Sequence, residues 1–168
     1  MKNIVRTLIL LLSLFLISGC SAMNASDYLR IHIRANSNTI EDQNIKYLVK
    51  DVMVEYMTPL LSDAKSKEEA VEIIEDNFNN LTQLVNEVLA QNGFNYTCSI
   101  VINNEFFPTR SYEDLTLDSG FYDAVIVNLG EATGNNWWCV VYPNMCFNEL
   151  NNIVYKSKIW EIINKIMG

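Results

Sequence analysis

The sequence predicts an α+β fold in which an amphipathic helix pair packs on a mainly antiparallel sheet, with a further helix at the C-terminus. Three observations predict it. Residues 29–35 alternate apolar and polar side chains, as a strand does. Apolar residues then recur every three or four positions up to about residue 92, as in helices. From residue 95 the period returns to two, which indicates several further strands.

The N-terminus has the pattern of an export signal. Lys2 and Arg6 precede an apolar run over residues 8–17, which ends in Ser18-Gly19-Cys20. Ten residues rising ~1.5 Å each span about 15 Å, half of the ~30 Å bilayer core, so the run is too short for a comfortable membrane span. The small residues before the cysteine resemble a lipobox, which makes residues 1–19 a signal peptide and Cys20 the lipid attachment site.

This interpretation places the mature protein outside the cytoplasmic membrane and attached to it. Residues 20–27 then form a lipidated polar tether, and the acyl chains bind the membrane. Two alternatives stay open: an ordinary secretory signal in which Cys20 is incidental, or a short uncleaved anchor over residues 7–23.

The charge excludes one class of partner. The chain has 12 basic and 20 acidic side chains, and loss of Lys2 and Arg6 with the signal leaves ten basic against twenty acidic. A domain this acidic is a poor ligand for nucleic acid. No Gly-rich phosphate loop or metal motif occurs, so we expect no cofactor, no metal and no small-molecule substrate.

The first half of the domain contains one strand and two helices. Residues 29–35 place their apolar side chains on one face, with Arg30, His32 and Arg34 on the other, which predicts a half-buried strand. Thr39 begins a helix that runs to about Leu61. The capping box at residues 66–69 begins a second helix that Gly93 ends.

The second half of the domain is expected to be strands followed by a helix. Strands are expected over residues 96–102, 106–111, 121–129 and 137–142, with a turn at residues 103–105. The last two strands should pair as an antiparallel hairpin, and the opening strand should pair with a later one. The domain proper covers residues 28–147, and residues 148–168 form a C-terminal amphipathic helix.

The remaining cysteines indicate a small disulfide loop. Cys139 and Cys146 flank a Pro-Asn turn signal, and outside the membrane a disulfide between them can persist. It would stabilise the fold by ~2–3 kcal/mol in the loop-entropy model. Cys98 lies in an apolar strand pattern and is expected to be a buried small hydrophobe. With a single histidine and no Cys-x2-Cys pair, zinc binding is not indicated.

His32 is the one candidate for an imidazole base. Its neighbours Arg30 and Arg34 disfavour its charged form, and no nucleophile is close in sequence. A structural or interface role is therefore preferred to catalysis. Trp137 and Trp138 are adjacent, so they point to opposite faces of a strand. Either one lies in the core while the other marks an interface, or the strand is buried on both faces.

The sequence resembles the stage II sporulation protein R family of endospore-forming Firmicutes. The resemblance covers about residues 28–147. It begins with LRIHIRANS (residues 29–37) and continues with EDQ (41–43), Lys46, KSKEEA (65–70) and FFPT (106–109) with Tyr112. Its most specific part is GNNWWCVVYP (134–143) with Cys146 and Phe147.

The resemblance implies a signalling protein and not an enzyme. Family members are exported from the forespore into the space between the two membranes of the engulfed cell. There they activate a membrane-embedded aspartic protease of the mother cell, which processes pro-sigma-E. A lipobox, which is not a feature of every member, suggests presentation from the forespore membrane.

Six residues are predicted to lie on the surface that contacts the protease. The exposed part of residues 32–36 and the hairpin over residues 135–147 would form this surface. The predicted contact residues are Arg30, His32, Arg34, Asn36, Trp137 and Trp138. Two other functions stay open: an extracytoplasmic hydrolase that uses His32, and a structural envelope lipoprotein.

Overall fold

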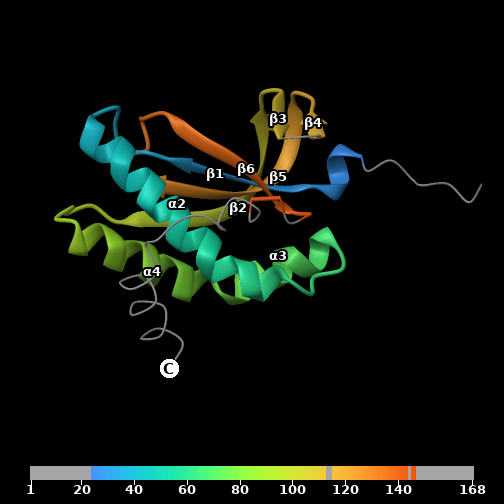
Figure 1. The fold of residues 1–168 in the computed structure, drawn as a ribbon, viewed down its shortest axis with the longest axis horizontal. Helices are drawn as coiled ribbons and strands as arrows, with labels where there is room; N and C mark the ends of the chain where they lie inside the picture. Colours follow the sequence, from blue (N-terminus) through green and yellow to red (C-terminus); the bar gives the residue numbers. More distant parts are fainter. Residues whose placement is uncertain (1–23, 113–114, 144, 147–168) are drawn as a thin grey trace, which may run out of the picture.

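The computed structural model describes residues 24–112, 115–143 and 145–146 (Figure 1). The predicted signal peptide, Cys20 and the predicted helix over residues 148–168 lie outside these residues. The elements, in chain order, are η1 (Ala25–Asp27), β1 (Leu29–Arg34), α2 (Ile40–Leu61), α3 (Lys67–Asp76), α4 (Phe78–Gln91), β2 (Cys98–Phe107), β3 (Arg110–Tyr112), β4 (Leu115–Leu117), β5 (Gly120–Leu129) and β6 (Asn136–Tyr142). The α+β class predicted from the sequence is confirmed.

The helix boundaries follow from capping side chains. Thr39 Oγ1 accepts the backbone N–H of Asp42 at 3.3 Å, so α2 begins at the predicted place, and it ends at Leu61. Ser66 Oγ accepts the backbone N–H of Glu69 at 3.1 Å and begins α3. In the described residues, no helix is both long and apolar enough to cross a membrane.

The prediction of a single second helix is wrong, because Asn77 divides this segment into α3 and α4. Asn77 lies at φ −104° and ψ 7°, outside the helical range. Its side-chain Nδ2 donates to the Ile73 carbonyl at 2.8 Å, and its Oδ1 accepts the Tyr56 hydroxyl at 3.1 Å. A side chain that bonds to the backbone in this way competes with the helical ladder.

β1 lies inside the sheet, whose strand order is β2-β5-β1-β6. It pairs in parallel with β5 and antiparallel with β6, and β2 pairs antiparallel with β5. The prediction that the opening strand pairs with later strands is therefore confirmed. The predicted hairpin between residues 121–129 and 137–142 is wrong, because β1 lies between these strands.

Both faces of the sheet are covered. Helices α2, α3 and α4 pack on one face, and the small β3–β4 hairpin lies against the other (Figure 1). The core on the helix side includes Ile31, Val125 and Val141 from the sheet. A second apolar cluster lies under the hairpin and includes Phe107, Leu117 and Ile126. The sheet is thus the middle layer of three.

This arrangement corrects two predictions about the strands. β1 is not half-buried, because Arg30 and His32 on its polar face are 0% and 1% exposed. The predicted turn at residues 103–105 does not form either, since β2 continues through it and pairs residue for residue with β5. The asparagines of β2 fit there because the strand lies at the sheet edge and their side chains reach solvent.

Candidate functional site

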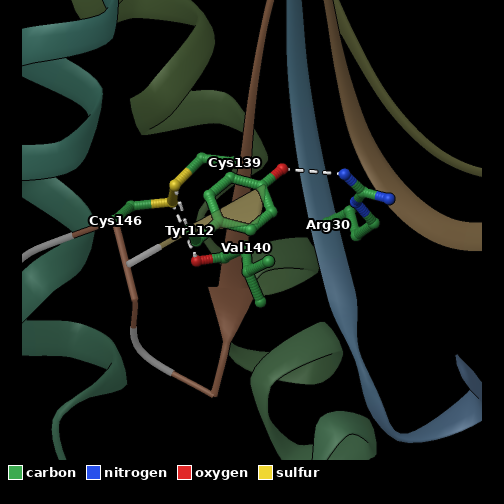
Figure 2. Close-up of a disulfide and its surroundings, with 5 residues drawn as sticks. All are labelled: Arg30, Tyr112, Cys139, Val140 and Cys146. Carbon is green, nitrogen blue, oxygen red and sulfur yellow. Dashed lines mark hydrogen bonds between the residues drawn. A yellow bond between two sulfur atoms is a disulfide. The ribbon is translucent and has the colours of Figure 1, made fainter. Parts of the chain in front are cut away.

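Arg30 is a buried cation held by aromatic rings. Its Nη2 donates to the Tyr112 hydroxyl at 2.7 Å (Figure 2). Its guanidinium carbon lies 4.2 Å from the centroid of the Phe107 ring and 4.8 Å from that of Tyr122. Cation–π contacts of this kind compensate in part for lost hydration. Arg30 therefore attaches the β3–β4 hairpin to the sheet and is not available to a partner.

His32 lies next to Arg30 on the same face, between two aromatic rings. Its ring centroid is 5.4 Å from that of Phe107 and 4.8 Å from that of Trp138. Burial, then the charges of Arg34 and Arg30, lower the pKa of His32 to about 4. The imidazole is neutral at neutral pH, and its Nε2 lies 3.2 Å from the Glu105 carboxylate.

Arg34 is the charged residue of β1 that reaches the surface. Its side chain is 29% exposed, and its Nη2 lies 2.5 Å from Glu105 Oε2. Its Nη1 donates to Asn128 Oδ1 at 3.2 Å. Of the three charged or titratable residues predicted to face a partner from β1, Arg34 is the one that remains accessible.

Two loops meet where β1 ends, and together they form what we call the loop platform: residues 36–39 and residues 130–135. Asn36 joins them, because its Oδ1 accepts the Glu131 N–H at 2.9 Å and its carbonyl accepts the Thr133 hydroxyl at 2.8 Å. Asn38 Oδ1 accepts the Asn135 N–H at 2.7 Å. The Asn36 side chain is thus used within the fold, while Asn38, Thr133 and Asn135 are exposed.

A buried carboxylate fixes the base of the loop platform. Asp42 accepts hydrogen bonds from Asn36 Nδ2 (2.9 Å), Ser37 Oγ (2.5 Å) and the Tyr96 hydroxyl (2.6 Å). Burial raises the pKa of Asp42, but these hydrogen bonds outweigh it and hold the pKa below the ordinary 3.8. Burial and the contact with Asp42 raise the pKa of Tyr96. The carboxylate is therefore ionised and holds two loop residues at the start of α2.

A buried lysine and a glycine complete the platform. Lys46 is 1% exposed, and burial lowers its pKa. Its Nζ donates to the Asn135 carbonyl at 3.0 Å and to Gln43 Oε1 at 2.7 Å. Gly134 donates its N–H to the Ala35 carbonyl at 2.9 Å, and a β-carbon there would collide with the backbone carbonyl of Ser37. The two loops therefore pack at backbone contact distance.

Trp137 and Trp138 are both partly buried, on opposite faces of β6. Trp137 packs against the helix-side core, where Lys50 Nζ lies 5.8 Å from its ring centroid. Trp138 packs over His32, and Arg110 lies 5.8 Å from its ring centroid. Of the two arrangements considered, the strand covered on both faces is the one observed. Neither tryptophan is among the strongly exposed apolar residues.

A disulfide joins Cys139 in β6 to Cys146, with the two Cα atoms 5.8 Å apart (Figure 2). The Cys146 N–H donates to the Val140 carbonyl at 3.2 Å and closes the loop across its base. Cys98 is a free, half-buried thiol at the start of β2, and burial raises its pKa to about 11. The described residues include no cluster of three metal-ligating side chains.

Sequence reasoning missed the residues that build the platform. Asp42 lies at an expected helix start and Glu105 in an expected turn, so the sequence marks neither as part of a site. Asp42 fixes the platform, whereas Glu105 lies beside it through its pairing with Arg34. Their partners, Tyr96 for Asp42 and Arg34 for Glu105, lie more than fifty residues away in the sequence. Gly134 could have been noticed as the glycine in the most specific stretch of the resemblance.

The fold and these loops define a three-layer α+β domain with a rigid polar surface at one end of its central strand. The family model described as stage II sporulation protein R (spore_II_R) matches residues 25–152. Stage II sporulation protein R of Bacillus subtilis (strain 168) is 32% identical over 124 residues, which are 74% of this chain and 55% of that relative. No solved structure matches the chain.

The chain belongs to the stage II sporulation protein R family, as the resemblance predicted. It spans about half the length of the curated relative that it matches. The matched region contains the loop platform, the buried Arg30–His32 face and the disulfide.

Proposed function

We propose that this chain is an exported signalling protein of sporulation that activates a membrane-embedded aspartic protease, which then processes pro-sigma-E in the mother cell. The family match over residues 25–152 is the observation that supports it. In this proposal Cys20 carries a lipid, and the domain acts in the space between forespore and mother cell. The chain acts by binding and not as an enzyme.

A binding event is the physical requirement of such a signal. The ligand must bind the active arrangement of the protease better than the inactive one, or the equilibrium does not shift. A ligand that is already ordered loses less conformational entropy on binding, which favours a rigid contact surface. The loop platform has this property, because Asn36, Asp42 and Lys46 hold both of its loops.

The proposed contact residues change accordingly. Arg30 and His32 are buried, so we assign them to the packing of the β3–β4 hairpin. Arg34, Asn38 and Asn135 are accessible to a partner at or beside the platform. Ile40, which is 75% exposed directly after the first loop, adds an apolar contact.

The geometry gives no support to a hydrolase that uses His32. The residues shown to contact its ring are Glu105, Phe107 and Trp138, and none of these carries a hydroxyl or thiol nucleophile. A pKa near 4 makes the imidazole a weak base. These contacts are those of a packed structural histidine.

The test is pro-sigma-E processing in a sporulating strain deleted for this gene, measured by immunoblot. We expect deletion to block cleavage and the wild-type gene to restore it. Complementation with Cys20→Ala then shows whether the lipid is needed, since full restoration would make it dispensable. Normal processing in the deletion strain would contradict the proposal and favour a structural envelope lipoprotein.

A further inference from the structure

β2 is a long sheet edge that is only partly protected, since its one charged side chain, Glu105, is paired with Arg34. It has ten residues, contains no proline or lysine, and pairs with β5 without a register shift. Native proteins normally shield such an edge with charges, prolines, bulges or a covering element, because it is a template for another strand. The opposite edge, β6, has seven residues and leads into Pro143 and the disulfide. An open edge of this length therefore requires an explanation.

The backbone groups on the outer side of β2 belong to its even-numbered residues. Side chains already accept two of the outward N–H groups: Asn86 Oδ1 accepts that of Cys98 at 2.8 Å, and Asn103 Oδ1 accepts that of Asn104 at 2.9 Å. In an antiparallel pair, alternate residues direct both their N–H and C=O to the same side. The backbone N–H and C=O groups of Ile100, Ile102 and Phe106 thus point outward. No strand within the described ranges pairs with them.

An open groove on the surface of α4 lies near the start of this edge, because Asn86 and Thr82 of α4 contact Cys98. It has a volume of about 510 Å³ and is lined by Asn79, Thr82, Gln83, Asn86, Glu87 and Ala90. These positions form one face of the helix. Thr82 O lies 3.7 Å from Cys98 Sγ, and α4 packs beside β2 (Figure 1). Proteins that bind extended peptides by strand addition use an exposed sheet edge for backbone hydrogen bonds and neighbouring side-chain pockets for specificity.

The other end of β2 offers an apolar anchor. Phe106 and Phe121 are 57% and 67% exposed, and their ring centroids lie 5.8 Å apart in an edge-to-face arrangement. Val101, 45% exposed, lies on the opposite face of the strand. An added strand would place alternate side chains on these two faces.

We propose that the β2 edge binds an extended segment of a partner protein as a fifth strand of the sheet. The segment has an apolar residue for the Phe106–Phe121 pair and polar, non-acidic residues for the α4 groove. The charge supports this choice: the chain carries a net charge of −8, Glu87 lines the groove, and the Glu105 carboxylate is paired with Arg34.

The inference rests on the proposed function, since it describes how the membrane protease would be engaged. Its test compares Asn104→Pro with Asn104→Ala in the full mature chain. Both variants lose the carboxamide that bonds Asp123. Only proline also replaces the outward N–H, which Asn103 Oδ1 accepts in the free chain, with a ring that obstructs an added strand. Binding to the purified protease in detergent is measured by titration. The proline variant should bind at least about tenfold more weakly, and the alanine variant within about threefold of wild type.

Amide hydrogen exchange of the wild-type chain provides a measurement that needs no variant. On addition of the protease, the amides of Ile100, Ile102 and Phe106 should gain protection, while those of Val101 and Asn103 should not change. Unchanged exchange at all five would overturn the inference. Protection that appears with rising protein concentration alone would assign the edge to a second copy and overturn it too. Protection that is present in the free chain and is lost on deletion of residues 148–168 would assign the edge to that segment and would also overturn the inference.

The two proposals fail in different ways. If wild type and both Asn104 variants bind the protease equally, the signalling function stands and the β2 inference is overturned. If wild type does not bind the protease at all, the proposed function and the inference that rests on it both fail. Thermal unfolding of the two variants shows whether each still folds.

Discussion

At the scale of single residues, His32 gives the domain a dependence on pH. Its pKa falls from 6.5 to about 4 on folding, so the unfolded chain binds more protons between these values. Stability therefore decreases as pH falls from 6.5 towards 4. Asp42 and Asp123 have pKa values below 3.8, so their contribution is lost only at still lower pH.

We predict that His32→Gln removes most of this dependence. The wild-type free energy of unfolding should fall by on the order of 3 kcal/mol between pH 6.5 and pH 4, at ~1.4 kcal/mol per unit of pKa difference. The variant should show a nearly flat profile over the same interval. Urea unfolding at several pH values measures both. Equal slopes for the two proteins would show that other groups dominate.

Gly134 is the residue at which the two loops of the platform approach most closely. We predict that Gly134→Ala destabilises the domain by more than about 2 kcal/mol, because the new β-carbon would collide with a backbone carbonyl that cannot rotate away. Thermal unfolding measures the loss. Gly93→Ala is the control: no atom lies within 4 Å of its β-carbon position, so any loss there reflects its φ of +82° alone. A loss no larger at Gly134 would contradict the close packing.

At the scale of elements, the disulfide joins β6 to the segment that follows it. We predict that Cys139→Ala with Cys146→Ala lowers the free energy of unfolding by about 2–3 kcal/mol. The wild type in reducing buffer should lose a similar amount, whereas the double variant should not respond to reductant. Thermal unfolding with and without reductant measures this. A wild type that is insensitive to reductant would show that the bridge does not stabilise the fold.

α2 could be predicted from the sequence, whereas the break between α3 and α4 and the order of the strands could not. Local signals define α2, since its apolar period and the Thr39 cap lie within the segment itself. The place of β1 depends on partners near residues 126 and 138. No local pattern shows which distant strand is adjacent in the sheet. The sequence therefore favours pairing the two clearest strands, residues 121–129 and 137–142, with each other.

The same reason explains the misplaced contact residues. The alternation of Arg30, His32 and Arg34 with apolar residues is the pattern of a solvent-facing strand. Arg30 and His32 are nevertheless buried, because aromatic rings from β2, β5 and β6 and the β3–β4 hairpin cover them. A sequence pattern does not show whether a polar side chain faces water or lies under aromatic rings. The disulfide, in contrast, involves two cysteines seven residues apart, and its pairing is the one that their spacing suggested.

At the scale of the whole molecule, the domain has two surfaces of different character. The loop platform is polar and internally fixed, while the β2 edge has unpaired backbone groups and exposed aromatic rings. They lie at different places on the sheet, since the platform follows β1 and the edge is the outer side of β2. A partner can therefore be oriented by one surface and held by the other, and variants at the two should weaken binding independently.

The central position of β1 also determines when the chain can fold. Ile31 pairs with Cys139, so the first strand of the described sheet is completed by its last strand, more than one hundred residues later. Closing so long a loop is slow compared with forming a helix. A growing chain would therefore lack its finished sheet until residue 142 has been made. An unfolded chain can pass through a narrow translocation channel, whereas a folded domain cannot, so under the proposed export this topology would keep the chain competent to cross the membrane until its last sheet strand has been made.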